Sequence, residues 1–277
     1  MTRLGIVQMT SGIDPSDNAD TMVRAIAKLA LQGAEIVFTP EMSGLLDRDR
    51  ARMMARIRSE EDDAVLAAVR RAARAHGVWV AIGSLAVAPS DAGKDDDGRL
   101  ANRSFLIDAE GNIAARYDKI HLFDVDLGEG ERWMESKAYR AGDRAVVADT
   151  PAGRLGLSIC YDIRFPRLYD VLSEAGAELI TIPAAFTRPT GTAHWHLLAR
   201  ARAVESTAFV VAAAQTGAHE DGRATYGHSL VIDPWGEILL DMGTAAGSAL
   251  CDIDLTRIGD VRRRLPSRDH RTHIARL

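Results

Sequence analysis

Residues 4–41, LGIVQMTSGIDPSDNADTMVRAIAKLALQGAEIVFTPE, contain the pattern that decides the fold. LGIVQM at 4–9 and EIVFTP at 35–40 are apolar runs of strand length, and Asp17 is the expected helix cap between them. Apolar residues in the intervening segment recur at the spacing of one helix face: Met22, Ile26, Leu29 and Ala30. Gly33 stands where the end of a helix favours a residue that tolerates positive φ. The stretch predicts strand, helix and strand in succession, which is typical of layered α/β structures.

The same alternation continues along the chain. Further helices are expected at 60–75, 165–175 and about 192–207. Hairpins are expected around Glu110-Gly111 and Pro234-Trp235-Gly236, and residues 89–100, with three consecutive aspartates, form a loop by composition. No linker rich in proline and serine divides the chain, so we predict a single domain over 1–277. Because the strands are apolar on both faces, each half of the chain is expected to contribute a helix-covered sheet to an α/β sandwich.

Composition excludes several classes of protein. The chain has 277 residues, of which 47% are hydrophobic and 26% charged, which is typical of a globular protein and not of a disordered one. A net charge of −5 argues against a nucleic-acid partner. No run of about 18 uncharged apolar residues occurs, and no secretory signal is visible, so we expect no membrane partner. A small molecule is the expected ligand.

The two cysteines occupy different positions in the pattern. They are too few for a disulfide framework or a cysteine-rich metal cage, which favours a reducing, cytoplasmic setting. Cys251 alternates within ALCDIDL and is expected in the core. Cys160 ends the strand LGLSI, at the edge of a sheet where α/β proteins bind ligands. Taken alone, Cys160 is as consistent with a small buried apolar residue as with a nucleophile.

Two further residues follow strands in the same way. Glu41 follows IVFTP, and Lys119 closes the strand ARYD; separately they are consistent with a helix-terminal acid and a surface lysine. A thiol with an ordinary pKa of about 8.5 is only a few per cent ionised at pH 7, so a nucleophilic Cys160 needs a base or a cation beside it. Glu41 and Lys119 could supply both.

These residues also lie in motifs that resemble a known family. The motifs TPE, YDKIHLFD and ICYDIRFP, which contain Glu41, Lys119 and Cys160, are similar to the Glu-Lys-Cys signature of the nitrilase superfamily, the carbon–nitrogen hydrolases. Other stretches resemble the branch of this superfamily that acts on deaminated glutathione: AHWHLLARARAVES, VVAAAQTG, YGHSLVIDPWGEI and RRRLP. The resemblance covers nearly the whole chain. It implies a four-layer αββα sandwich, no metal, no organic cofactor, and homodimers or higher homo-oligomers.

The resemblance also implies a mechanism. Glu135 in RWMESKAYRAGD matches a second carboxylate of the family's site. Glu41 is expected to take the proton of Cys160, and the thiolate to attack an amide carbonyl and form a thioester. Lys119 and the backbone N–H of Tyr161 are the expected donors to the oxyanion.

The expected substrate is a small carboxylate amide. Arg164, four residues after the nucleophile, is close enough in sequence to pair with a substrate carboxylate or to form a structural ion pair. Phe186 and Thr187 follow the strand ELITIP and are expected to line the same pocket. The resemblance favours hydrolysis of deaminated glutathione to 2-oxoglutarate and cysteinylglycine, a metabolite-repair reaction. An omega-amidase acting on 2-oxoglutaramate, another small linear amide as substrate, and a catalytically idle binding subunit are the alternatives.

The sequence gives less support for a metal site, a histidine-dependent protease or a phosphate-binding loop. His194 and His196 are two apart on a predicted helix and point to different sides of it, so we expect no metal pair. His121 and His228 could serve a Cys-His protease, but neither has a recognisable partner in the sequence. Neither glycine-rich phosphate-binding motif is present.

Overall fold

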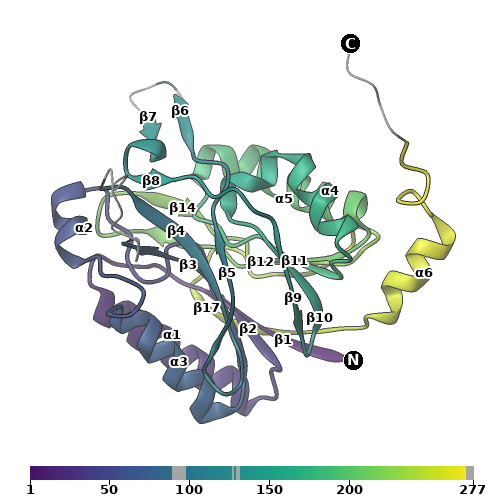
Figure 1. Ribbon diagram of the computed structural model, residues 1–277, viewed down its shortest axis with the longest axis horizontal. Coiled ribbons are helices and arrows are strands. Elements are labelled where there is room, and N and C mark those ends of the chain that lie inside the picture. Colours follow the sequence, from purple (N-terminus) through teal and green to yellow (C-terminus); the bar gives the residue numbers. More distant parts are fainter. Residues whose placement is uncertain (89–97, 127, 129–131, 273–277) are drawn as a thin grey trace.

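The computed structural model describes residues 1–88, 98–126, 128 and 132–272. Its described residues form two stacked sheets with helices on both outer faces (Figure 1). The first sheet has the order β17-β1-β2-β3-β4-β5, with β8 beside β4. Its strands are β1 (Thr2–Gln8), β2 (Ile36–Phe38), β3 (Trp79–Val87), β4 (Leu100–Ile107), β5 (Ile113–Asp118), β8 (Tyr139–Arg140) and β17 (Gly247–Ile253). The C-terminal strand β17 thus returns to pair with the N-terminal strand β1.

The second sheet has the order β16-β15-β12-β11-β10-β9. Its strands are β9 (Val146–Thr150), β10 (Gly153–Leu157), β11 (Leu179–Thr181), β12 (Phe209–Ala212), β15 (Leu230–Ile232) and β16 (Ile238–Asp241). Two small ribbons lie outside the sheets: β6 (Asp124–Asp126) with β7 (Arg132–Met134), and β13 (Thr216–Ala218) with β14 (Ala224–Tyr226).

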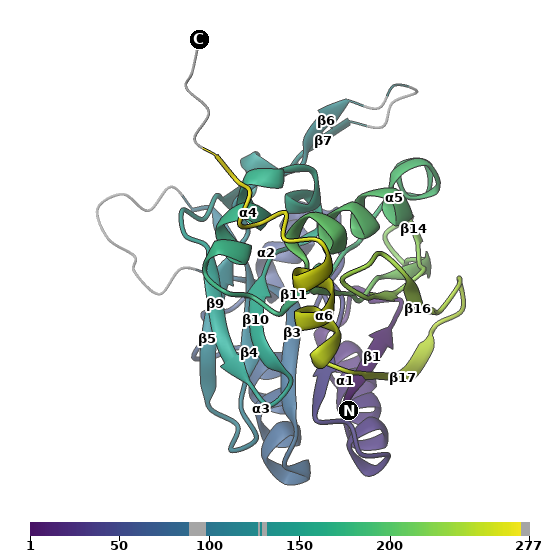
Figure 2. The same cartoon turned by 90° about the vertical axis from the view of Figure 1, so that its right-hand side faces the viewer.

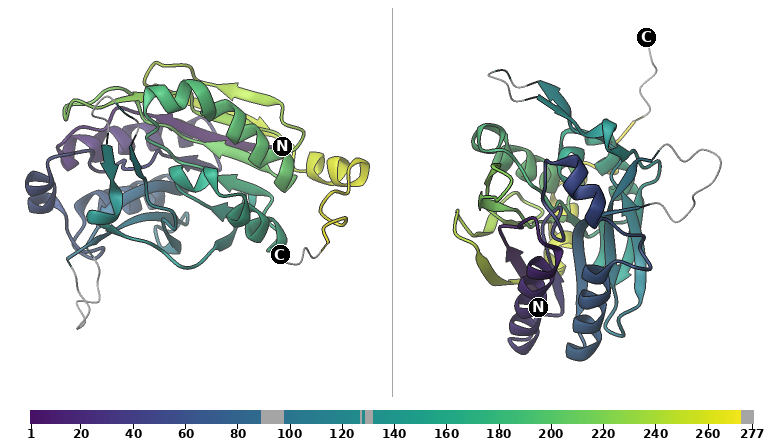
Figure 3. Two further views of the ribbon diagram at one scale, coloured as in Figure 1. Left: turned by 90° about the horizontal axis from the view of Figure 1, so that it is seen from above. Right: turned by 90° about the vertical axis from the view of Figure 1, so that its left-hand side faces the viewer.

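Helices complete the four layers. Helices α1 (Pro15–Leu31) and α3 (Ala64–His76) pack on the first sheet, and α4 (Pro166–Glu174) and α5 (Arg188–Ser206) pack on the second (Figure 3). Helix α6 (Thr256–Arg264) follows β17 at one end of the sandwich (Figure 2). The predicted αββα sandwich is confirmed.

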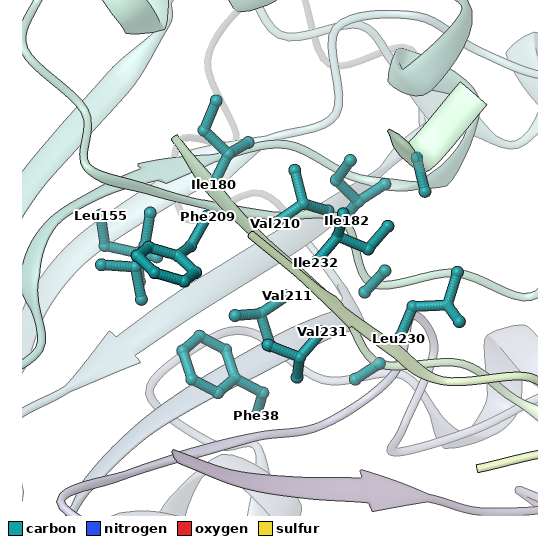
Figure 4. Packing of buried hydrophobic residues seen from close by; sticks show 14 of the residues in the cluster. Phe38, Leu155, Ile180, Ile182, Phe209, Val210, Val211, Leu230, Val231 and Ile232 are labelled. Carbon is teal, nitrogen blue, oxygen red and sulfur yellow. The ribbon is translucent and has the colours of Figure 1, made fainter. Parts of the chain in front are cut away.

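Alternate residues of the first sheet serve two cores. Phe38 packs between the sheets, close to Val211 and Val231 of the second sheet (Figure 4). Its neighbour Val37 points to the opposite face of the sheet and packs with α1 and α3. Because successive side chains of a strand point to opposite faces, one apolar run can fill both layers. Burial of a side chain such as Phe38 contributes about 1.5–3 kcal/mol.

Several helix boundaries differ from the predictions because other residues cap the helices. Helix α1 begins at Pro15 and is capped by Asp14, whose carboxylate accepts from Ser16 N at 2.9 Å, so Asp17 lies inside the first turn. Helix α3 begins at residue 64, not 60, because the Asp63 side chain accepts from Leu66 N at 2.7 Å.

Two further differences concern α5 and an unexpected helix. Helix α5 begins at Arg188, four residues earlier than expected, since Pro189 is well suited to the first turn of a helix. The short helix α2 (Arg50–Arg56) was not predicted. Most of the loop predicted at 89–100 lies outside the described residues, and Leu100 already belongs to β4. Among the helices of the described chain, none combines the length and apolar character that crossing a bilayer requires.

Candidate active site

Glu41 lies at the carboxyl end of β2, in a segment held by close backbone packing. The next residue, Met42, has φ +55°, and its N–H donates to Ser84 Oγ at 2.9 Å. Gly83 lets the two segments approach, because a Cβ at that position would lie 2.2 Å from Thr39 O. The pairing of β3 with β4 shifts register at the same point. These contacts fix the direction of the buried Glu41 carboxylate.

Lys119 follows β5 and is only 2% exposed. Its Nζ donates to Glu41 Oε1 at 2.8 Å and to both oxygens of Glu135, at 3.0 and 2.9 Å. Glu135 also accepts from Phe123 N at 2.6 Å. The structure therefore brings Glu41, Lys119 and Glu135 into one buried charge cluster.

Asn102 of β4 completes this cluster, and it was not predicted from the sequence. Its Nδ2 donates to Glu41 Oε1 and Glu135 Oε1, both at 3.1 Å, and its backbone carbonyl accepts from Lys119 N at 2.9 Å. Asn102 Oδ1 is buried and has no hydrogen-bond partner among the described residues. The available signal was a group of three consecutive polar residues, Asn102, Arg103 and Ser104, within the strand LANRSFLI.

Cys160 comes from the second sheet, in the 3₁₀ turn Cys160–Arg164 after β10. Its φ is +47°, and its N–H donates to Pro183 O at 2.8 Å. The fully buried Asp162 accepts from Ile159 N at 2.9 Å and from Tyr117 Oη of β5 at 2.7 Å. Asp162 thereby ties the turn that carries the thiol to the strand that precedes Lys119.

A cavity of about 830 Å³ opens above these residues. Its wall includes the cysteine and the charge cluster as well as three of the predicted substrate contacts: Cys160, Glu41, Lys119, Glu135, Tyr161, Phe186 and Thr187. The thiol, the carboxylates and the ammonium therefore meet at one solvent-accessible space large enough for a small metabolite.

Arg164 is absent from the cavity wall among the described residues, but it lies directly behind two residues of that wall. Its guanidinium lies over the rings of Tyr161 and Phe186, at 6.0 and 5.6 Å, and Nη2 is 3.3 Å from His194 Nδ1. A 3₁₀ turn has three residues per turn, so Arg164 shares a side with Tyr161 and not with Cys160. Both rings line the cavity, and Arg164 has no ion pair with a carboxylate among the described residues, so its role in binding a substrate carboxylate stays a prediction.

Comparison with known proteins identifies the family. The sequence profile described as carbon-nitrogen hydrolase matches residues 3–263. This chain belongs to the carbon–nitrogen hydrolase family.

Relatives of this hydrolase support the same assignment. It is 38% identical over 275 residues to the deaminated glutathione amidase of Yersinia enterocolitica, which covers 99% of this chain and 94% of that protein. The crystal structure of the Caenorhabditis elegans NitFhit protein superposes on this chain with a TM-score of 0.88 and 36% sequence identity. The match covers 98% of this chain and 65% of the NitFhit chain. An amidase from Nesterenkonia sp. AN1 is 26% identical with a TM-score of 0.78, covering 96% and 99% of the two chains. That structure is a glutamate-to-glutamine variant that shows Michael addition of acrylamide at the active site cysteine. The predicted family is confirmed.

Electrostatics of the hydrolase site favour a protonated thiol beside an ionised carboxylate. Burial alone would raise the pKa of Glu41, but the Lys119 ammonium and its hydrogen bond hold that pKa below its ordinary value. Burial, and then the negative charge of Glu41, raise the pKa of Cys160 well above its ordinary value. Burial opposes the charge of Lys119, yet Glu135 and Glu41 raise its pKa well above the usual range. At rest, the site pairs a thiol with a base and does not hold a thiolate.

The histidines have partners that the sequence did not reveal. His121 Nδ1 lies 2.7 Å from Asp162 Oδ1. His196 Nε2 and His228 Nδ1 lie 3.0 and 2.9 Å from oxygens of Asp241. Within the described parts of the chain, His196, His228 and Asp241 have ligand atoms close enough together to hold a metal ion. They are absent from the described wall of the cavity, and hydrogen bonds between them account for their arrangement.

Proposed function

We propose that this hydrolase cleaves the amide bond of deaminated glutathione and releases 2-oxoglutarate and cysteinylglycine. The observation that carries the proposal is the buried Glu41–Lys119–Glu135 cluster beside Cys160 at the base of one cavity. Family membership gives the reaction class, and the name of the Yersinia enterocolitica relative supports the choice of substrate. The complete set of a thiol, a base and a fixed cation also argues against a catalytically idle binding subunit.

The reaction begins with proton transfer from the Cys160 thiol to Glu41. Sγ then attacks the amide carbonyl carbon, and Lys119 Nζ and the N–H of Tyr161 stabilise the oxyanion that forms. When the tetrahedral intermediate collapses, the carbon–nitrogen bond breaks and Glu41 gives its proton to the leaving amine. Glu41 next takes a proton from a water molecule that attacks the thioester, and the thiol is restored.

Glu135 and Asn102 hold the charged groups in place in this scheme. Two carboxylates on one ammonium keep Lys119 charged throughout the cycle, because its pKa lies far above neutrality. Asn102 directs one N–H₂ group at both carboxylates, which sets their spacing.

A side-by-side assay tests the proposal. Purified protein is given deaminated glutathione or 2-oxoglutaramate, and 2-oxoglutarate formation is measured in both reactions. Turnover of the first substrate at higher kcat/KM supports the proposal, whereas preference for the second indicates an omega-amidase. Cys160→Ala is expected to abolish turnover with little change in Tm, and activity retained in that variant refutes the mechanism.

Glu41→Gln tests the base separately from the nucleophile. We expect kcat to fall by about 10²- to 10⁴-fold, the range for loss of a general acid–base. The glutamine has the same shape and keeps one oxygen, which can still accept from Lys119 Nζ; its amide nitrogen replaces the oxygen that accepts from Ala185 N, so Tm is measured beside kcat. Unchanged kcat would exclude Glu41 as the base.

We also propose that the protein forms a homodimer or a higher homo-oligomer. Apolar side chains on the outer face of the second layer of helices are exposed: Val171, Leu197 and Val204. Leu197 of α5 is 68% exposed, which is unusual for leucine unless a partner covers it. Light scattering after size exclusion should give a multiple of 30.0 kDa, and Leu197→Asp should reduce it.

A reducing compartment such as the cytoplasm suits this chemistry. Cys160 and Cys251 are both free, and the proposed nucleophile works only as a thiol. Reversible loss of activity on oxidation with a mild disulfide reagent would support this requirement.

A further inference from the structure

The cavity has a second polar region, formed by Trp133 and two arginines. The Arg48 guanidinium lies 5.0 Å from the centre of the Trp133 ring, and that of Arg223 lies 5.6 Å from it. Trp133 belongs to β7, Arg48 follows the Glu41 segment, and Arg223 lies in the turn between β13 and β14. All three residues line the same cavity as Cys160. Three separate segments therefore place two cations on one aromatic ring.

Arg223 is held with its outer nitrogens unused. Its Nε donates to Asp221 Oδ2 at 2.5 Å, and the Asp221 side chain is fully buried. Neither Nη of Arg223 has a hydrogen bond to another described residue. Because the Asp221 carboxylate accepts only from Nε of the guanidinium, the two Nη groups of Arg223 can both donate to one ligand.

Arg48 and Trp133 add further donors without acceptors. Arg48 is exposed and has no ion pair or hydrogen bond with any residue in the described ranges. The indole Nε1 of Trp133 is buried and also has no hydrogen-bond partner in the described part of the chain. A buried donor without an acceptor is costly, and two guanidinium groups on one ring repel each other. An anion bound in this part of the cavity would offset the repulsion and supply the acceptor that these donors lack.

The position of these donors indicates which part of a substrate they contact. Cys160 is only 9% exposed, so an acyl group bound to its sulfur lies deep in the cavity. Arg48 lines the same cavity but is exposed, so it lies where the cavity meets solvent. The cavity of about 830 Å³ leaves room for a substituent on the amide nitrogen.

We propose that Arg48, Arg223 and Trp133 bind a carboxylate carried by the leaving amine. The preferred substrates are then secondary amides whose amine product ends in a carboxylate, as a dipeptide does, and not primary amides that release ammonia. This inference rests on the proposed function and names the group that distinguishes deaminated glutathione from 2-oxoglutaramate. The acyl portion is the same in both.

Three substrates separate this role from a general effect of charge. They are deaminated glutathione, its analogue with the terminal carboxylate converted to a carboxamide, and 2-oxoglutaramate. Arg223→Ala should lower kcat/KM for the first by about 10- to 100-fold, mainly through KM, the size expected for a lost pair of charge-assisted hydrogen bonds. The other two substrates should change by less than about twofold. The kcat/KM of the wild type for the carboxamide analogue should be about equal to the kcat/KM of Arg223→Ala for deaminated glutathione.

Two more variants control the experiment. Arg223→Ala leaves the buried Asp221 carboxylate without its partner, which lowers stability. Arg48→Ala breaks no ion pair among the described residues, so it is measured in parallel. It should show the same loss of selectivity between the three substrates. Arg71→Ala removes an equal charge from an exposed position on α3, outside the cavity wall, and should leave all three rates unchanged.

Direct binding distinguishes failure of this inference from failure of the proposed function. Calorimetry on Cys160→Ala measures the Kd of deaminated glutathione without turnover, and Arg48→Ala in that background should raise it by about tenfold or more. Equal losses on all three substrates, no loss, or an unchanged Kd would overturn the inference. Absence of hydrolysis by the wild type, with binding still dependent on Arg48, would overturn the proposed function alone.

Discussion

Replacing Lys119 with methionine tests the buried charge cluster in the most direct way. The substitution keeps the length of the side chain but leaves Glu41 and Glu135 facing the same Asn102 amide without a cation. Removing one partner from a buried ion pair costs about 3–5 kcal/mol in free energy of unfolding. For a chain of this size, about 2 °C per kcal/mol gives a decrease in Tm of roughly 6–10 °C.

The loss of stability should depend on pH in a defined direction. In the wild type, burial favours a higher pKa for Glu41, but Lys119 outweighs burial and holds that pKa below its ordinary value of 4.5. That carboxylate therefore stabilises the fold above pH 4.5, and the contribution is lost as pH falls through the lower native pKa. In Lys119→Met, burial acts without the cation and raises the pKa of Glu41, so the protonated carboxyl is favoured in the fold and stability falls as pH rises above 4.5. The difference between the two proteins should widen from about pH 4 to about pH 8.

Urea unfolding at these two pH values provides the measurement. Lys28→Met, at an exposed lysine of α1 whose Nζ contacts only Ser248 Oγ at 3.2 Å among the described residues, is the matched control and should change stability by less than about 0.5 kcal/mol. An equal loss at both pH values, or a loss below about 1 kcal/mol at the higher one, would refute the electrostatic argument.

Three further predictions concern the surroundings of the site. Asp162→Asn replaces an acceptor of several donors with a group that is half donor, and should cost about 1–3 kcal/mol in urea unfolding; unchanged stability would contradict its anchoring role. Gly83→Ala should lower stability by about 1–3 kcal/mol because its Cβ would overlap Thr39 O, whereas Gly247→Ala, with nothing within 4 Å, should not; equal effects would exclude overlap as the cause. Acrylamide at about pH 8 should alkylate Cys160, which lines the cavity and has Glu41 beside it as a base, and spare Cys251, which is buried and absent from the cavity wall; mass spectrometry of peptides decides, and equal labelling would contradict the assignment.

Much of the fold could be predicted because the spacing of apolar residues shows which faces of each strand and helix are covered by another layer. The run at 4–9 and the helix after it were located correctly, since a strand with two apolar faces must be covered twice. Helix starts were less accurate, because a nearby aspartate such as Asp14 or Asp63 can cap a helix earlier or later than its periodic residues suggest. The return of β17 to β1 was not visible, as no local pattern encodes the pairing of strands that lie at opposite ends of the chain.

The site was predictable where residues end strands. Glu41, Lys119 and Cys160 follow strands and were chosen because their motifs resemble the family's signature, and the structure places them around one cavity; their catalytic roles stay predictions. Asn102 was missed because it is one of three consecutive polar residues in its strand, and nothing in the sequence shows which of them faces the site. Arg164 lies beside the cavity wall and is not part of it, because spacing along the chain does not show the rotation of a 3₁₀ turn; its role stays a prediction.

The origin of the site in two different sheets has a consequence for how this protein tolerates change. The charge cluster is attached to the first sheet and the sulfur to the second, so their separation depends on the side chains packed between the sheets, such as Phe38. Protein interiors are close-packed and barely compressible, so a residue there sets the distance between the reacting groups without contacting the substrate. Sequence drift in this core is therefore limited by catalysis as well as by folding, and turnover should decline in core variants that still unfold cooperatively.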